Sequence, residues 1–320
     1  MNQRTFVILL PMPTRTPLSF LILLVVFLAA CQTGTAPAPT ALSTFSPSPT
    51  QPISTLTETP LPAVTGEAVV TSTPLSAALG LDPAAWHSWP VLPIVPENAR
   101  QIYQLGQALG NDPHAFSVLG DCNSLPEVFM GVYETDPQAV SALPQGLQET
   151  VAWFSGSFNR QSPTVRAGTT TGALLWSQWH QNQYTCTSDE TPLQCELRLH
   201  KPSFAIIQVG SHYEARNEDY MRTILNQLVV AGVVPILASK ADDIEANEQV
   251  NTEYAALAVE YNIPFWNFWA AVEGLPNRGL YSRPEDSYQG GLYLTDEAIA
   301  IHRLTALQVL DLVRRAVGDQ

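Results

Sequence analysis

Three short loops of this sequence contain residue types that could do chemistry. Each loop follows an apolar run, and the loops span residues 120–124, 210–213 and 239–243. The first contains Cys122, whose thiolate form is a strong nucleophile. The second contains His212, a residue type that serves as a general base or as a hydrogen-bond donor. These are residue types that nucleophilic catalysis needs, provided that the fold brings the two side chains together.

A charged pair and two tryptophans add to these candidates. Lys240 and Asp243 lie in the third loop, where they could hold a polar ligand or form an ordinary solvated loop. Trp266 and Trp269 present aromatic faces that suit sugar rings, but tryptophans within an apolar run are more typical of a hydrophobic core. The sequence leaves both alternatives open for each pair.

The elements that must position these loops alternate along the chain. Apolar runs predict strands, and amphipathic patterns predict helices. The strands are expected at 115–119, 204–209, 233–238 and 263–268, and the helices at 218–231, 248–261 and 295–317, the last with Thr295 as its N-cap. This alternation predicts an α/β fold, a three-layer α/β/α sandwich around a mostly parallel sheet. Ligands of such sheets bind outside the carboxyl ends of the strands, where the three loops are expected.

The region from about residue 97 to 316 resembles the SGNH (GDSL-type) hydrolases, a family with a three-layer, flavodoxin-like fold. The segment Phe-Ser-Val-Leu-Gly-Asp-Cys-Asn-Ser at 116–124 matches the family's first block, in which the nucleophilic serine follows the first strand in Gly-Asp-Ser. Gly168 matches the oxyanion-hole glycine of the second block. Gly-Ser-His-Tyr at 210–213 matches the third block, usually Gly-x-Asn-Asp, and Gly-Gly-Leu-Tyr at 290–293 matches the fifth, usually Asp-x-x-His. The resemblance implies an esterase cleft lined by Gly168, Gly210, Lys240, Asp243 and Tyr293 beside Cys122.

Four positions depart from the family's catalytic pattern. Cys122 replaces the serine and His212 replaces the asparagine, and both changes are compatible with activity, since a thiolate can attack and an imidazole can donate a hydrogen bond. Tyr293 replaces the histidine base and Gly290 replaces the aspartate that orients it. A phenol with a pKa near 10 is a poor base at pH 7, and glycine orients nothing. The usual mechanism is therefore not available to this sequence.

A rearranged dyad is one alternative for the missing base. The family fold points the third-block side chain at the oxyanion that the nucleophile generates, so Cys122 and His212 are expected to be neighbours. Asp121, Asp242 or Asp243 could orient the imidazole. The other alternative is that the cleft is no longer catalytic and that both side chains are simply packed within it.

The remaining histidines do not suit the cleft. His302 lies inside the last predicted helix, at the wrong spacing for the family's base and on the wrong face. His200 precedes a strand and is expected at the opposite end of the sheet. His87, His114 and His180 have no placement that links them to the cleft.

The cysteines suggest an oxidising compartment. Cys186 and Cys195 bracket a polar, turn-forming stretch, which predicts a disulfide worth roughly 2.5–3 kcal/mol by loop-closure entropy. If Cys31 is lipidated, Cys122 is left as the free thiol, and it is either a reactive group or a buried cysteine that behaves as a small hydrophobe.

The amino-terminal third is typical of an export signal followed by a spacer. Two arginines precede a short apolar run, and Leu-Ala-Ala-Cys at 28–31 resembles a bacterial lipobox, which implies a lipid-modified Cys31 at the mature amino terminus. An ordinary signal peptide is the alternative, and Met12 could be the true start in place of Met1. Residues 32–78, rich in Ser, Thr and Pro, are expected to be a disordered tether that reaches about 35–40 Å, and residues 79–320 to be the folded domain.

Composition excludes several classes of function. With 15 basic and 29 acidic residues the chain carries −14, so binding of nucleic acid is not expected. No zinc-binding spacing occurs, and no metal or cofactor is implied. The sequence therefore predicts an extracytoplasmic lipoprotein, anchored to the bacterial cell membrane at Cys31, whose domain binds an envelope glycan, lipid or partner protein. The alternatives are an ester hydrolase that uses Cys122 and a purely structural lipoprotein.

Overall fold

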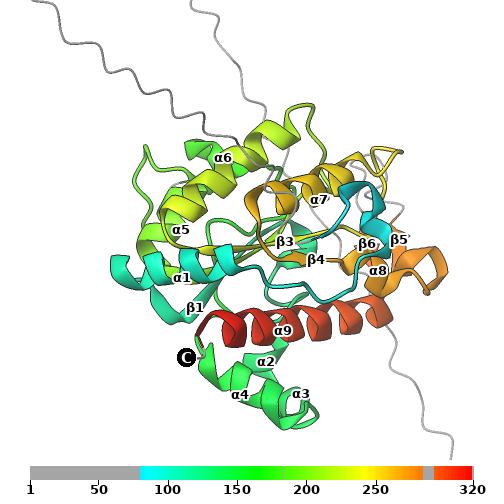
Figure 1. Ribbon diagram of the computed structural model, residues 1–320, viewed down its shortest axis with the longest axis horizontal. Coiled ribbons are helices and arrows are strands. Elements are labelled where there is room, and N and C mark those ends of the chain that lie inside the picture. Colours follow the sequence, from blue (N-terminus) through cyan, green and yellow to red (C-terminus); the bar gives the residue numbers. More distant parts are fainter. Residues whose placement is uncertain (1–79, 182, 284–291, 319–320) are drawn as a thin grey trace, which may run out of the picture. The chain divides into compact units, whose positions relative to one another are not determined.

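A parallel sheet positions the loops of interest (Figure 1). The computed structural model describes residues 80–181, 183–283 and 292–318. Within them the sheet has four strands in the order β1 (Asp112–Gly120), β2 (Pro202–Gln208), β3 (Val234–Ala238) and β4 (Phe265–Trp266), and each neighbouring pair is parallel. One further parallel bridge joins Gly120 to Val165.

The strands are apolar because helices cover both faces of the sheet. All five residues of β3 are buried, as are the first six of β2, so neither strand alternates between apolar and polar positions. Pro235 lies in the middle of β3, although proline cannot donate a ladder hydrogen bond. The Leu237 amide donates to the carbonyl of Pro264, on the β4 side of the strand. Pro235 comes two residues before Leu237, so its nitrogen points to the same side. Since β4 begins only at Phe265, Pro235 has no strand there to bond.

The helices form the two outer layers. In Figure 1, α6 (Asn217–Val230) and α7 (Gln249–Tyr261) lie on one side of β3 and β4, and α9 (Asp296–Gly318) lies on the other. Three helices pack against α9, namely α1 (Glu97–Leu109), α4 (Gln145–Trp153) and α8 (Phe268–Val272). This arrangement is a three-layer α/β/α sandwich, and it confirms the predicted fold class.

Shorter elements complete the described chain. They are α2 (Val132–Thr135), α3 (Pro137–Ser141), α5 (Pro192–His200), the antiparallel pair β5 (Leu280–Ser282) and β6 (Leu292–Leu294), and the 3₁₀ helices η2 (Pro83–Ser88), η3 (Cys122–Ser124), η4 (Ala173–Leu175), η5 (Ser177–His180) and η6 (Pro276–Gly279). The predicted disulfide is confirmed: Cys186 and Cys195 are bonded, with their Cα atoms 5.4 Å apart.

Two predicted boundaries can be compared directly with the structure. Thr295 accepts from the Ala298 amide at 3.4 Å, which confirms it as the N-cap of α9. The last strand is shorter than predicted, because Asn267 is the N-cap of α8. The side-chain Nδ2 of Asn267 donates to the carbonyls of Trp86 and Trp89. Phe268, which the apolar run predicts to end the strand, is therefore the first residue of α8.

The tryptophans of this segment belong to the hydrophobic core. Trp266 is fully buried, and Trp269 packs edge-on against Trp86. The core alternative for Trp266 and Trp269 is therefore the correct one, and neither ring presents a face for a sugar.

The predictions for the amino-terminal third lie outside the described residues. These are the signal peptide at 1–31 with Cys31 and the tether at 32–78, and the predicted match at Gly290 also lies outside. The described residues all fall within one compact unit of the chain. None of the helices in that unit's described part is long and apolar enough to cross a membrane.

Candidate functional site

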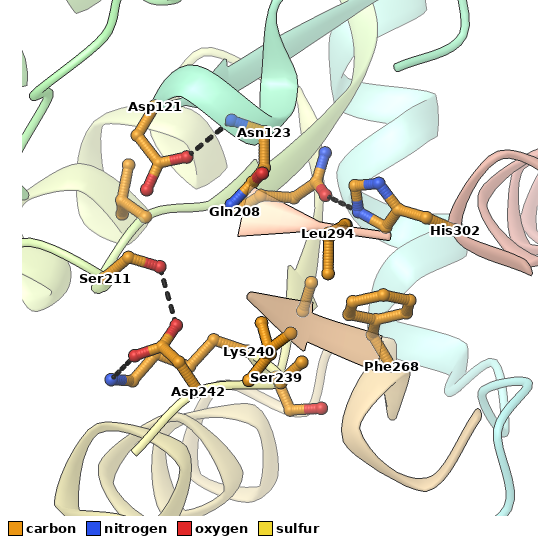
Figure 2. Close-up of a pocket in the computed structure, with 14 residues that line it drawn as sticks. Asp121, Asn123, Gln208, Ser211, Ser239, Lys240, Asp242, Phe268, Leu294 and His302 are labelled. Atoms are coloured by element: carbon orange, nitrogen blue, oxygen red, sulfur yellow. Dashed lines mark hydrogen bonds and ion pairs between the residues drawn. The ribbon is translucent and has the colours of Figure 1, made fainter. Parts of the chain in front are cut away.

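A small polar pocket lies at the carboxyl ends of β1, β2 and β3 (Figure 2). Most of its polar side chains come from the three loops that the sequence singles out, with Asp121 and Asn123 after β1, Ser211 after β2, and Lys240 and Asp242 after β3, while Gln208 of β2 and His302 of α9 also line it. The cavity measures about 40 Å³, which is room for a few water molecules. The predicted convergence of the three loops at one edge of the sheet is confirmed.

The first loop places a buried carboxyl group, that of Asp121, next to the expected nucleophile Cys122. Asp121 caps η3, and its side chain accepts from the Asn123 amide at 3.0 Å. Burial raises the pKa of Asp121 to about 6, against the opposing effects of this hydrogen bond and of nearby His212; Asp242 raises it further. A carboxyl group of this pKa can exchange a proton near neutral pH.

The third loop contains a buried ion-pair cluster. Lys240 Nζ lies 2.8 Å from Asp242 Oδ1 and also pairs with Glu245, and all three side chains are at most 8% exposed. Asn251 of α7 fixes the loop, because it bonds both the amide and the carbonyl of Lys240, at 2.8 and 2.9 Å. Asp243, the other charged residue that could hold a polar ligand, accepts from the Glu248 amide at 2.6 Å and does not line the pocket. The solvated-loop alternative is wrong for Lys240, which is buried.

The second loop turns sharply after β2. Gly210 has φ +125°, and a Cβ there would lie 2.7 Å from Val250 Cγ1, so only glycine fits. Ser211 donates to Asp242 Oδ2 at 2.7 Å and joins the second loop to the third (Figure 2). His212 lies close enough to Asp121 to lower the pKa of that carboxyl group, but it does not line the pocket.

Cys122 does not line the pocket either. Its side chain is half-buried, and burial together with the Asp121 charge raises the pKa of its thiol to about 12, despite an opposing effect of Arg283. Among the described residues no hydrogen bond joins Cys122 to His212. The Cys122–His212 dyad therefore stays a prediction, although the surroundings of the thiol favour its protonated form.

The fifth-block segment packs beside the first loop. Tyr293 lies in β6 opposite Tyr281 of β5, and the Arg283 guanidinium lies 3.9 Å from the centre of its ring. The Asn123 side chain donates through Nδ2 to the carbonyl of Leu292 at 3.4 Å. The described end of the segment matched to the fifth block, Leu292 and Tyr293, therefore includes a contact to the first loop. Arg283, which influences both Cys122 and Tyr293, has no signal in the sequence that separates it from other loop arginines.

His302 is the histidine that lines the pocket, so its exclusion by sequence reasoning is wrong. It projects from α9 and bonds Gln208 at the end of β2 (Figure 2). Burial lowers its pKa to about 3, so the imidazole is neutral at pH 7, and its Nδ1 has no partner among the described residues. The missed signal is helical spacing, because His302 lies four residues from both Ala298 and Ala306 on the buried stripe of α9.

None of His87, His114, His180 and His200 lines the pocket. His200 bonds the carbonyl of Phe116 near the start of β2, and His87 pairs with Glu248. His114 bonds Trp153 and His180 bonds the carbonyl of Glu190. They have structural partners.

Gly168, the predicted oxyanion glycine, does not line this pocket and instead lines a separate groove. The pocket's carboxylates, hydroxyls and ammonium can hold a small polar group or exchange a proton through Asp121. In the described part of the chain, no three acidic, histidine or cysteine side chains gather in a way that could hold a metal ion.

Comparison with known proteins adds no relative. No family model matches the chain, and no curated protein matches it.

Proposed function

We propose that this chain is an extracytoplasmic lipoprotein, anchored to the bacterial membrane through Cys31, whose SGNH-hydrolase-like domain binds an envelope ligand without hydrolysing it. The observation that carries the proposal is the state of Cys122. Its thiol has a pKa of about 12 and no base hydrogen-bonded to it among the described residues. A thiol in this state is almost wholly protonated at neutral pH and cannot act as the family's nucleophile.

The pocket supports binding of a polar group. Asp121 and Asp242 supply acceptors, while Lys240 has its charge matched by Asp242 and Glu245. Buried polar groups that already pair with one another form a rigid surface, which favours selective recognition of a hydrogen-bond donor. The pocket is small, so it would take one end of a larger ligand.

The alternative is an ester hydrolase that uses Cys122. Its support is the meeting of the first-block loop with the segment of Tyr293, which is the place of the family's base. A ligand that moved His212 or Tyr293 towards the thiol would be needed to activate it.

Hydrolysis of p-nitrophenyl acetate by the full chain tests the proposal. We expect the wild type and Cys122→Ala to give the same rate, close to the buffer background, at pH 7 and pH 9. Serine at this position restores the family's nucleophile, so Cys122→Ser is a second comparison and should also be inactive, because the base is missing. Turnover that disappears in Cys122→Ala would establish the enzyme and overturn the proposal.

Binding is tested separately with the full chain carrying Cys31→Ala, so that no lipid anchor contributes. We expect it to co-sediment with isolated bacterial envelope material. Ser211→Ala, which removes the bond to Asp242 in the pocket, should sediment less, and Ser141→Ala, at an exposed site in α3, should not differ. If the wild-type domain did not co-sediment with envelope material, the proposal that it binds an envelope ligand would be contradicted.

A further inference from the structure

A second hollow, the aromatic groove, is far larger than the polar pocket. It measures about 470 Å³, within the ~300–1,000 Å³ range of small-ligand sites, against about 40 Å³ for the pocket. Its main lining residues are Gly168, Gly172, Trp176, Trp179, Glu214 and Tyr220. It shares none of its lining with the pocket, so it is a separate candidate site.

Three aromatic rings line the groove. Trp176 is 54% exposed and contacts no other aromatic ring or guanidinium among the described residues. Trp179 and Tyr220 each carry a guanidinium, from Arg166 at 4.8 Å and from Arg216 at 5.2 Å, and both still present surface to the groove. A large, solvent-exposed aromatic ring that lines a groove is a surface that a ligand can cover.

A carboxylate lies among these rings. Glu214 Oε2 accepts from the Gly172 amide at 2.7 Å, while no described residue bonds Glu214 Oε1. A Cβ at Gly172 would lie 2.8 Å from Glu214 Oε2 and 2.9 Å from Tyr220 Cε2, so glycine is what allows the carboxylate and the ring to pack there. The groove therefore offers one acceptor-only oxygen beside Tyr220, in a hollow that Trp176 and Trp179 also line.

The segment that carries the tryptophans is held in place. Trp176 lies between η4 and η5, and Trp179 Nε1 donates to Thr169 Oγ1 at 3.2 Å. His180, at the end of η5, is buried and bonds the carbonyl of Glu190 at 2.9 Å. Because the Trp179 ring is held by this hydrogen bond and the backbone of Trp176 lies between two 3₁₀ helices, a ligand would lose little free energy in ordering this segment.

We propose that the aromatic groove binds a neutral oligosaccharide. The C–H faces of a pyranose ring pack on aromatic faces, and its hydroxyl or acetamido groups can donate to Glu214 Oε1. A lipid chain would desolvate that carboxylate without giving it a donor. Glu214 lines the groove, whereas Arg166 and Arg216 contact Trp179 and Tyr220 without lining it, so the groove's own charged lining and the net charge of −14 disfavour an anionic sugar. The inference goes beyond the proposed function, since the groove would bind a glycan even if Cys122 proved catalytic.

The test is calorimetric titration of the full chain in a detergent that has no sugar head group. The probes are chitotetraose and cellotetraose, both neutral, and tetragalacturonate, which is anionic. We expect binding of at least one neutral tetramer and none of the anionic one. Trp176→Ala should weaken binding at least tenfold, while Leu109→Ala, a matched change at a site 56% exposed on α1, should have no effect.

Two further variants separate stacking from simple apolar contact. Trp176→Phe keeps an aromatic face and should retain binding within a few-fold, whereas Trp176→Leu should be as weak as Trp176→Ala. Glu214→Gln should weaken binding several-fold by replacing an acceptor oxygen. An equal urea midpoint for every variant shows that the fold is intact.

Several results would overturn the inference. They are no heat with either neutral tetramer, unchanged binding in Trp176→Ala, tighter binding of tetragalacturonate, and full binding by Trp176→Leu, which would indicate an apolar occupant. The ester assay on Cys122 does not depend on any of these results, so either proposal can fail alone.

Discussion

At the residue scale, burial decides the protonation of the groups that a catalytic site would use. Cys122 and Asp121 are adjacent, and burial is the largest cause of the raised pKa of each. The negative charge of Asp121 raises the thiol pKa further. In an active cysteine enzyme a neighbouring cation or imidazole has the opposite effect. The first loop therefore holds a carboxyl group that titrates near neutrality and a thiol that does not.

The first prediction concerns the reactivity of Cys122. At pH 8 a thiol with a pKa of about 12 has roughly a thousandfold less thiolate than one at the ordinary value of 9.0. We expect alkylation of Cys122 by iodoacetamide to be slower than that of a free cysteine peptide by about this factor, with a rate still rising at pH 10. Peptide mapping measures it, and half-maximal reactivity below pH 8 would instead support the dyad.

The second prediction concerns Asp121 and pH. The unfolded carboxyl titrates near 3.8 and the folded one near 6, so its ionisation makes the wild type lose stability as pH rises from 4 to 6. Asp121→Asn keeps a capping oxygen and does not titrate. Relative to wild type, it should therefore gain on the order of 2–3 kcal/mol between pH 4 and pH 8.

Urea unfolding at the two pH values measures this difference. Asp136→Asn, at the exposed N-cap of α3, is the matched control for a change of cap alone. An equal effect of Asp121→Asn at both pH values would show that the carboxyl group is not titrating in this range.

At the element scale, the connection between β3 and α7 is held by charge rather than by apolar contact. Lys240 lies between Asp242 and Glu245, and Glu245 Oε1 accepts from the Val250 amide near the start of α7. The cluster thus ties the end of the strand to the start of the helix. A buried group of this kind is strongly sensitive to loss of one partner.

The third prediction is that Lys240→Met destabilises the domain by about 3–5 kcal/mol, because two carboxylates are left buried without a cation. Adding Asp242→Asn and Glu245→Gln should recover most of the loss. Lys201→Met, at an exposed site, should have little effect. Urea midpoints measure all three, and a mild effect of Lys240→Met would show that water reaches the cluster.

At the scale of the whole molecule, an acidic domain is expected to be carried on a tether. The charge of −14 disfavours docking on an anionic membrane surface, so the proposed lipid at Cys31 is what would hold the chain there. Both hollows, the polar pocket and the aromatic groove, would then face ligands from a domain held at some distance from the bilayer.

The fourth prediction is that Cys31→Ala abolishes labelling of the full chain with a fatty-acid precursor in a bacterial host and moves the protein out of the membrane fraction. The reason is that the lipobox cysteine is the expected acceptor of the acyl chains. Cys122→Ala should keep both the label and the membrane location. Labelling that persisted in Cys31→Ala would favour an ordinary signal peptide and another attachment.

Local pattern was sufficient for strands β1 to β3, for helices α6, α7 and α9 and for the edge of the sheet where the loops converge, but it did not predict α1, α4 and α5. Strands buried on both faces must be apolar throughout, so β2 and β3 are visible as runs, and loops after parallel strands must share one edge. The disulfide could also be predicted, since a polar, turn-forming stretch of eight residues lies between its cysteines. These features depend on neighbours in sequence and on general rules of connection.

The composition of each site depended on tertiary structure. His302 reaches the end of β2 across 94 residues of chain, and only the rotation of α9 against the sheet decides that its ring lines the pocket. Lys240 pairs with Asp242 and Glu245 and not with Asp243. The reason is that the loop is buried and Asn251 holds the backbone of Lys240 in place. The sequence by itself determined the α/β class with its parallel sheet, strands β1 to β3, helices α6, α7 and α9, and the disulfide. Side-chain partners and pKa values were decided by the tertiary structure, because burial and distance are properties of the packed chain.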